Sequence, residues 1–157
     1  MQVSIKLNYI VIAVITFVVS LLGRFFTSTG MQWYYTLNLP SYTPPAWFIG
    51  AVWMVIFATT ATAVTLVWNR FERDAKFWLI IGLFALNAVL NVLWTYLFFN
   101  QHMIGYAFVD AVGLFTTVLL LIVLIGQRSL FVASLLAPYL GWLTFATFLN
   151  FVIWWTN

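Results

Sequence analysis

The sequence has no cysteine, one histidine and only three acidic residues among its 157 positions. Without cysteine there are no disulfides, thiolate metal sites or cysteine nucleophiles. One histidine cannot form a histidine metal cluster, and so few carboxylates provide little for acid–base or hydrolytic catalysis. The six basic residues form no run or stripe suited to nucleic acid. These absences argue against a classical enzyme, a metalloprotein and a nucleic-acid-binding protein, and they predict no required cofactor.

Apolar residues dominate the chain: 65% are hydrophobic, 20% are aromatic and 6% are charged. In soluble domains about 25% of residues are charged, so we interpret the chain as a polytopic membrane protein. A bilayer core about 30 Å thick is crossed by about 20 apolar residues in a helix. The first apolar run lacks a small-residue cleavage site and is interpreted as a span rather than a signal peptide. We predict an all-α, single five-helix transmembrane domain over 1–157, with a long loop at 27–45 and spans at about 5–26, 46–69, 77–99, 104–125 and 130–155.

The positions of the basic residues predict an orientation in the membrane. Arg24 alone lies at the end of the first span that leads into the long loop. By the positive-inside rule, the N-terminus is expected in the cytoplasm of a bacterial plasma membrane, with the long loop and the C-terminus outside. The residues that define the cytoplasmic side are Lys6, Arg70, Arg73, Lys76 and Arg128.

The long loop ends in a proline-rich stretch that leads into the second span. Pro40, Pro44 and Pro45 restrict the backbone of the loop and of the residues before them. Pro45 is expected as the first helical residue, where its missing N–H costs nothing. We interpret the stretch as a stiff lid next to an aromatic wall that contains Trp33, Tyr34, Tyr42, Trp47 and Trp53.

Polar and aromatic side chains recur within three spans at helical spacing. Asn87, Asn91 and Trp94 lie at i, i+4 and i+7, so they share one helix face. Three residues of the fifth span lie at i, i+4 and i+8, which also places them on one helix face, and one helical turn separates two rings of the second. These faces favour a ligand pocket. An intramembrane Asn can equally form a hydrogen bond to a neighbouring helix, which stabilises the helix pair by about 1 kcal/mol. The further residues are Trp142, Ala146, Asn150, Trp53 and Phe57.

Two other features of the spans have more than one interpretation. Asp110 in the fourth span is either a proton or cation site or a satisfied structural carboxylate. Small residues at four-residue intervals in the fifth span allow close helix approach, inside the bundle or between subunits. Pro138 in that span is expected to kink it. The small residues are Ala133, Ala137 and Gly141.

Three blocks of the sequence resemble the translocator protein family, also called tryptophan-rich sensory proteins or peripheral-type benzodiazepine receptors. They are YTPPAWFIGAVW at 42–53, ALNAVLNVLWTYLFF at 85–99 and APYLGWLTFATFLNFVIWWTN at 137–157. The resemblance covers essentially the whole chain. It implies a homodimer of five-helix bundles with a lipophilic pocket under the first loop. The implied ligands are porphyrins, haem-like tetrapyrroles, sterols and isoquinoline or benzodiazepine-type molecules. The implied ligand-binding residues are Tyr34, Trp53, Phe57, Asn87, Asn91, Trp94, Trp142, Ala146 and Asn150.

The chain departs from the family pattern at several positions. Tyr42 stands where the family often has Trp, and Ala51 where it often has Pro. The C-terminal NFVIWWTN lacks the Tyr and basic residue of the sterol pattern, which disfavours that mode of binding. The leading hypothesis is a membrane binding protein or translocator for porphyrins or related planar lipophiles. The alternatives are light-dependent porphyrin degradation involving Trp142 and coupled transport, which the absence of an internal repeat disfavours.

Overall fold

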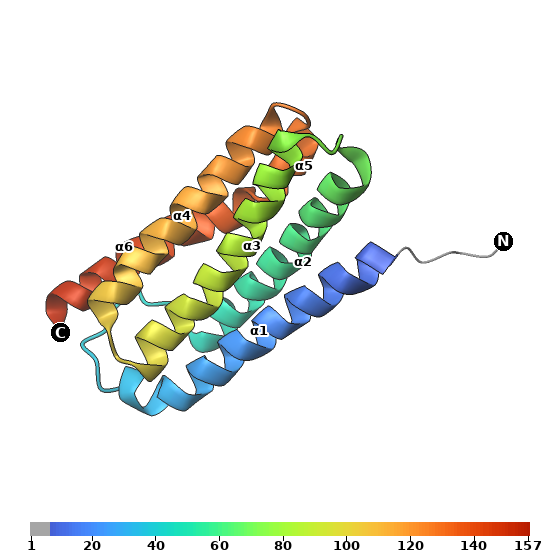
Figure 1. The fold of residues 1–157 in the computed structure, drawn as a ribbon. Coiled ribbons are helices and arrows are strands. Elements are labelled where there is room, and N and C mark those ends of the chain that lie inside the picture. Colours follow the sequence, from blue (N-terminus) through green and yellow to red (C-terminus); the bar gives the residue numbers. More distant parts are fainter. Residues whose placement is uncertain (1–6) are drawn as a thin grey trace.

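The computed structural model describes residues 7–157. These residues form a helical bundle (Figure 1). Five helical segments are long and apolar enough to cross a membrane. The third segment ends in a π-helical turn, η1, and the fifth is divided into a short and a long helix. The elements are α1 (Leu7–Tyr34), α2 (Ala46–Arg70), α3 (Ala75–Thr95), η1 (Tyr96–Asn100), α4 (Ile104–Gly126), α5 (Leu130–Ser134) and α6 (Ala137–Thr156).

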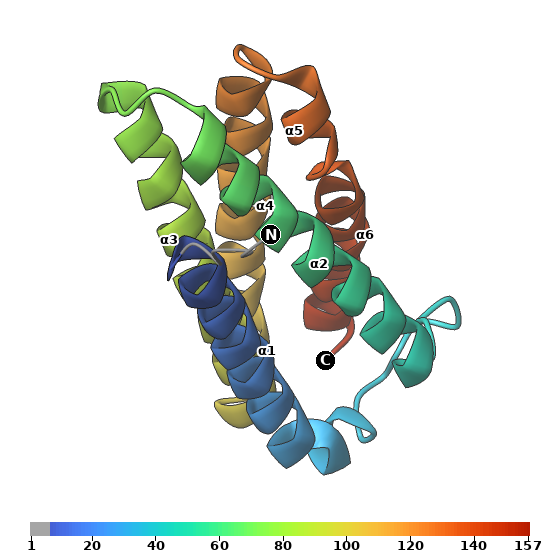
Figure 2. The same ribbon diagram turned by 90° about the vertical axis from the view of Figure 1, so that its right-hand side faces the viewer.

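The helices pack in a closed order that differs from their order in the chain. Helix α1 lies against α2 and α3, α3 packs on α4, α4 on α6, and α6 and α5 return to α2. The long loop and the C-terminus lie at one end of the bundle, and the turns after α2 and α4 lie at the other (Figure 1). Helix α1 stands at the edge of the bundle in both views (Figures 1 and 2). Its outer side is therefore not covered by another helix of the bundle, and its inner side faces α2 and α3.

Helix α1 is longer than the sequence predicted, and the loop is correspondingly shorter. The expected end was near residue 26, whereas the helix continues to Tyr34. The hydroxyls of Ser28 and Thr29 donate to the carbonyls of Phe25 and Phe26, which keeps these polar residues within the helix. The connection is therefore 35–45. Pro45 caps α2 instead of forming its first residue, with φ −66° and ψ 152°.

The fifth span breaks at residues 135–136, immediately before Pro138. Pro138 lies in the first turn of α6, where no helical N–H is needed. The break also separates the small residues that a continuous helix would have aligned. Ala133 is buried against Gly126, whereas Ala137 and Gly141 are exposed. Within the described chain only Ala133 therefore packs inside the bundle, and close approach at Ala137 and Gly141 stays a prediction for a contact between subunits.

Side chains connect the two turns at the end of the bundle opposite the long loop. Asp74 caps α3 by accepting a hydrogen bond from the Phe77 backbone N–H at 2.8 Å, and it pairs with Arg128 of the other turn. Lys76 donates to Gln127. The Phe77 N–H and the Arg128 guanidinium lower the pKa of Asp74 below its usual value. The described basic residues of these turns thus gather at one end, as their positions in the sequence predicted.

Replacing Asp74 with asparagine should remove a pH-dependent part of the stability. A lowered folded-state pKa stabilises the fold above the ordinary Asp pKa of about 3.9, and this contribution is lost as pH falls through the folded value. Asparagine retains a capping oxygen but not the charge. In detergent, Asp74→Asn should melt slightly earlier than the parent at pH 7, and the difference should be smaller at about pH 3, below the ordinary Asp pKa. Equal melting at both pH values would contradict the assignment.

Candidate functional site

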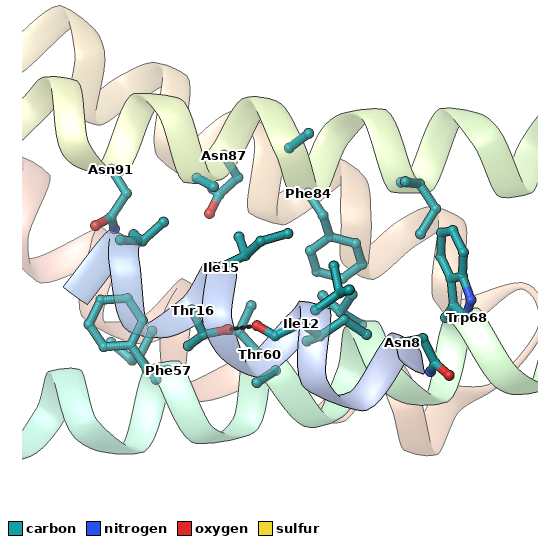
Figure 3. Close-up of a pocket in the computed structure, with 18 of the residues that line it drawn as sticks. Asn8, Ile12, Ile15, Thr16, Phe57, Thr60, Trp68, Phe84, Asn87 and Asn91 are labelled. Carbon is teal, nitrogen blue, oxygen red and sulfur yellow. Dashed lines mark hydrogen bonds between the residues drawn. The ribbon is translucent and has the colours of Figure 1, made fainter. Parts of the chain in front are cut away.

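A cavity of about 560 Å³ lies between α1, α2 and α3. It follows α1 from Asn8 to Val19, a stretch of about 16 Å at the helical rise of 1.5 Å per residue. The close-up in Figure 3 shows side chains of the three helices around it, with Asn8 and Trp68 at one end. The lining consists of Leu7, Asn8, Val11, Ile12, Ile15, Thr16 and Val19 of α1; Ile56, Phe57, Thr60, Ala61, Val64 and Trp68 of α2; Ile81, Phe84, Ala85, Asn87, Ala88 and Asn91 of α3; and Tyr139 of α6.

Most of this lining is aliphatic or aromatic, as is usual for small-molecule sites. The side chain of Phe57 lies on the α2 side and that of Phe84 on the α3 side (Figure 3). Trp68 lies at the end near the α2–α3 turn, and the guanidinium of Arg73 is 4.5 Å from its ring centroid. The cavity thus offers aromatic surface along its length, with a cation stacked on the tryptophan at its end.

Hydrogen bonds across three helices connect the polar groups at the end of the cavity towards the middle of the bundle. The Asn91 amide donates to the Tyr139 hydroxyl at 3.0 Å, and this hydroxyl donates to Asn87 Oδ1 at 3.0 Å. The Asn87 amide donates to Thr117 of α4 at 2.8 Å. Both asparagines therefore join helices, as the packing interpretation predicted, and both also line the cavity. The two interpretations of these residues are compatible.

Two buried polar atoms of the cavity have no hydrogen-bond partner among residues 7–157: Thr60 Oγ1 and Asn8 Nδ2. Thr60 differs in this from its neighbours on α2, since Thr62 and Thr65 donate to the carbonyls four residues before them. Thr16, which faces Thr60 from α1 in Figure 3, likewise donates to the Ile12 carbonyl at 2.8 Å. Because unpaired buried polar groups are costly, these two atoms mark positions where a ligand could bond.

The predicted ligand-binding residues divide into two groups. Phe57, Asn87 and Asn91 line the cavity, and the other six do not. Trp94 donates its indole N–H to Asn150 at 2.9 Å, and Asn150 donates to the Ile104 carbonyl at 3.1 Å. The remaining residues have aromatic contacts or lie half-buried on α6. Tyr34 contacts Phe98 and Phe99, Trp53 contacts Phe57 and Tyr139, Trp142 contacts Phe48 and Phe145, and Ala146 is half-buried.

The cavity lies in the half of the bundle away from the long loop, whereas the pocket was expected beneath that loop. A second hydrophobic cluster lies around Phe98 and Phe99, and Leu37 and Leu39 of the loop pack against it. The loop is also tied to the C-terminus, because the Asn38 backbone N–H donates to Asn157 Oδ1 at 2.8 Å. The extension of α1 brings Tyr34 into this cluster.

Asp110 is buried on α4, away from the cavity lining. One of its carboxylate oxygens has no hydrogen-bond partner among the described residues. It forms no ion pair with any described arginine, so within residues 7–157 no arginine satisfies this carboxylate. Within residues 7–157, no group of three or more His, Asp or Glu could hold a metal ion.

Five residues of the cavity on which the site depends were not predicted from the sequence: Asn8, Thr60, Trp68, Phe84 and Tyr139. The helical periodicity already contained part of the signal, because Trp53, Phe57 and Thr60 lie at i, i+4 and i+7, as Asn87, Asn91 and Trp94 do. Asn8 begins a similar series with Ile12 and Ile15 in the first span. Tyr139 could not be found in this way, because its position depends on where the fifth span breaks.

Comparisons with known proteins identify the family of this chain. The model of the TspO/MBR family matches residues 11–156. The tryptophan-rich protein TspO of Bacillus cereus is 36% identical over 141 residues, which cover 86% of this chain and 90% of the relative. The translocator protein of Homo sapiens is 33% identical over 136 residues, covering 86% and 80%. The tryptophan-rich protein TspO of Archaeoglobus fulgidus is 36% identical over 137 residues, covering 86% and 87%. This chain therefore belongs to the TspO/MBR family of integral membrane proteins.

Proposed function

We propose that this protein binds planar lipophilic molecules, with porphyrins and related tetrapyrroles as the first class to test, in the cavity between α1, α2 and α3. The observation that carries the proposal is the cavity itself, because Phe57, Asn87 and Asn91, predicted from the sequence as ligand-binding residues, meet there from two helices. Its volume of about 560 Å³ is within the range of about 300–1,000 Å³ of small-molecule sites.

Binding would use the burial of apolar surface and ring stacking. Phe57, Phe84 and Trp68 offer ring faces to a flat ligand. Asn87 Oδ1 accepts one hydrogen bond from Tyr139, and an amide oxygen has a second lone pair for a ligand N–H. A ligand would enter from the bilayer, since α1 at the edge of the bundle is the wall most exposed to lipid. In this proposal the N-terminus lies in the cytoplasm of a bacterial membrane and the protein forms a homodimer.

Filling the cavity should abolish much of the binding. Ala61 of α2 lines the cavity, whereas Ala58 of the same helix is exposed and lies outside it. Titration of the purified protein in detergent with protoporphyrin in the dark, followed by tryptophan quenching, should show affinity at least about tenfold weaker for Ala61→Phe, a loss of about 1.4 kcal/mol. Ala58→Phe should bind as the parent does. Equal affinity of Ala61→Phe and the parent would overturn the cavity as the site.

The same titration under illumination separates binding from light-dependent porphyrin breakdown. That activity would require an electron donor near the bound ring. Trp142 packs between Phe48 and Phe145 and is not part of the cavity lining, so the proposal assigns it no contact with ligand. Porphyrin absorbance that decays under light in the parent and persists in Trp142→Phe would instead favour the photochemical function.

A further inference from the structure

We propose that the cavity between α1, α2 and α3 selects uncharged lipophiles that carry a hydrogen-bond acceptor, and that Thr60, supported by Asn8, binds this acceptor. The inference rests on the proposed function and adds to it the chemical class of the ligand and two contact residues.

The first argument is the absence of charge along the lining. The described residues that surround the cavity include no Lys, Arg, His, Asp or Glu. A carboxylate transferred into such a site loses its hydration and finds no counter-ion, which is far more costly than burying an uncharged polar group. Arg73 stacks on the outer end of the cavity over Trp68, and its guanidinium is held there by Trp68 and Phe77. A ligand with charged groups would have to keep them outside.

The second argument is the chemistry of the unpaired atoms. Asn8 Nδ2 can only donate a hydrogen bond, and Thr60 Oγ1 can donate one. One of the two amide N–H groups of Asn87 bonds Thr117, and one of those of Asn91 bonds Tyr139. The Thr60 hydroxyl can also accept, but the Asn8 N–H groups can only donate, so an acceptor on the ligand, such as a carbonyl or ester oxygen, is the one group that can bond both residues.

The third argument is the position of Thr60. It lies on α2 about midway between Phe57 and Val64, and Figure 3 shows it across the cavity from Asn87. A hydroxyl that followed the pattern of Thr62 and Thr65 would bond a carbonyl of its own helix. That of Thr60 is buried without any partner in the described chain. A ligand acceptor next to Thr60 would be bonded in the middle of the cavity, where the surrounding side chains are mostly apolar. Asn8 Nδ2 would be available to a second acceptor at the Trp68 end of the cavity.

Protoporphyrin and its dimethyl ester test the selection, because they share one ring and differ in the charge of two side chains. Tryptophan quenching by each compound is measured in the dark at pH 7.4. Ala61→Phe, whose cavity is filled, serves as the background control, because the quenching that remains in it comes from porphyrin dissolved in the detergent. Only the quenching that exceeds this background is counted as binding in the cavity. The ester should bind the parent at least about tenfold more tightly than the free acid.

Variants at position 60 test the contact. Thr60→Val keeps the shape and removes the hydroxyl, and should weaken ester binding about fivefold, as expected for one hydrogen bond. Thr60→Ser should restore most of the affinity. Thr62→Val is the matched control, because Thr62 is exposed on the same helix and outside the lining, and it should bind as the parent does.

The outcomes separate this inference from the proposed function. If both porphyrins bind in the cavity and the free acid is as tight as the ester, the selection is wrong while the proposed function stands. The selection is equally wrong if tight acid binding depends on Lys6, which precedes the described residues, as Lys6→Gln would show. Unchanged ester binding by Thr60→Val removes the assigned contact. If neither porphyrin binds the parent above the Ala61→Phe level, both proposals fall.

Discussion

Of all single glycine-to-alanine replacements in the bundle, Gly30→Ala is expected to lower the stability most. Gly30 is buried in the last part of α1, against the π-helical turn η1. A Cβ at this position would be 2.1 Å from the carbonyl oxygen of Phe99 and 2.7 Å from its carbonyl carbon. These are backbone atoms and cannot rotate away, so α1 would have to move. Overpacking of this kind costs about 1–3 kcal/mol.

Thermal unfolding in detergent, followed by tryptophan fluorescence, measures the effect. Gly82→Ala is the control, because a Cβ at Gly82 in α3 meets nothing within 4 Å. It should leave stability unchanged or raise it by up to about 1 kcal/mol, since alanine is the better helix former. Because α1 also forms one wall of the cavity, Gly30→Ala should weaken ligand binding as well. Equal melting of the two variants would show that α1 and η1 are not in close contact.

The number of spans and their approximate positions followed from composition and hydropathy alone. The ends of the elements did not, because they depend on contacts between distant residues. Residues 27–34 contain Ser28, Thr29 and Gly30 and resemble a loop. They remain helical because their hydroxyls bond carbonyls within α1 and the glycine packs against Phe99. In the same way, Pro138 indicated a disturbance of the fifth span, but only the structure shows a full break before it.

Helical spacing predicted which side chains share a helix face but not where the cavity lies. Helical spacing correctly put Asn87 and Asn91 on one face, and both line the cavity. It could not show that Trp94, on the same face, uses its indole N–H for Asn150. The resemblance placed the pocket beneath the long loop, where this chain has Phe98 and Phe99 packed together with ring centroids 5.0 Å apart. Periodicity within one helix does not reveal which side chains fill a space between several.

Removing the hydroxyl of Tyr139 is the second change with a large expected effect. This hydroxyl accepts from Asn91 and donates to Asn87, so it joins α6 to α3 through two hydrogen bonds, and the amide of Asn87 continues to α4. In Tyr139→Phe, an amide N–H and an amide oxygen would both lose a partner at a buried position. Interhelical hydrogen bonds in membranes are worth about 0.6 kcal/mol on average and up to about 1.7. We expect a loss of about 1–3 kcal/mol, since unpaired buried groups add a penalty.

Unfolding of Tyr139→Phe is compared with that of Tyr106→Phe, whose side chain is 70% exposed on α4 and should not affect stability. Ligand binding distinguishes the structural role of this network from a direct contact. The loss of the hydroxyl frees the Asn91 amide and one lone pair of Asn87 within the cavity, so a ligand with an acceptor should recover part of the lost stability on binding. The melting temperature of Tyr139→Phe should therefore rise more on addition of protoporphyrin dimethyl ester than that of the parent. An equal or smaller rise would mean that the network holds the helices together without contributing groups to the ligand.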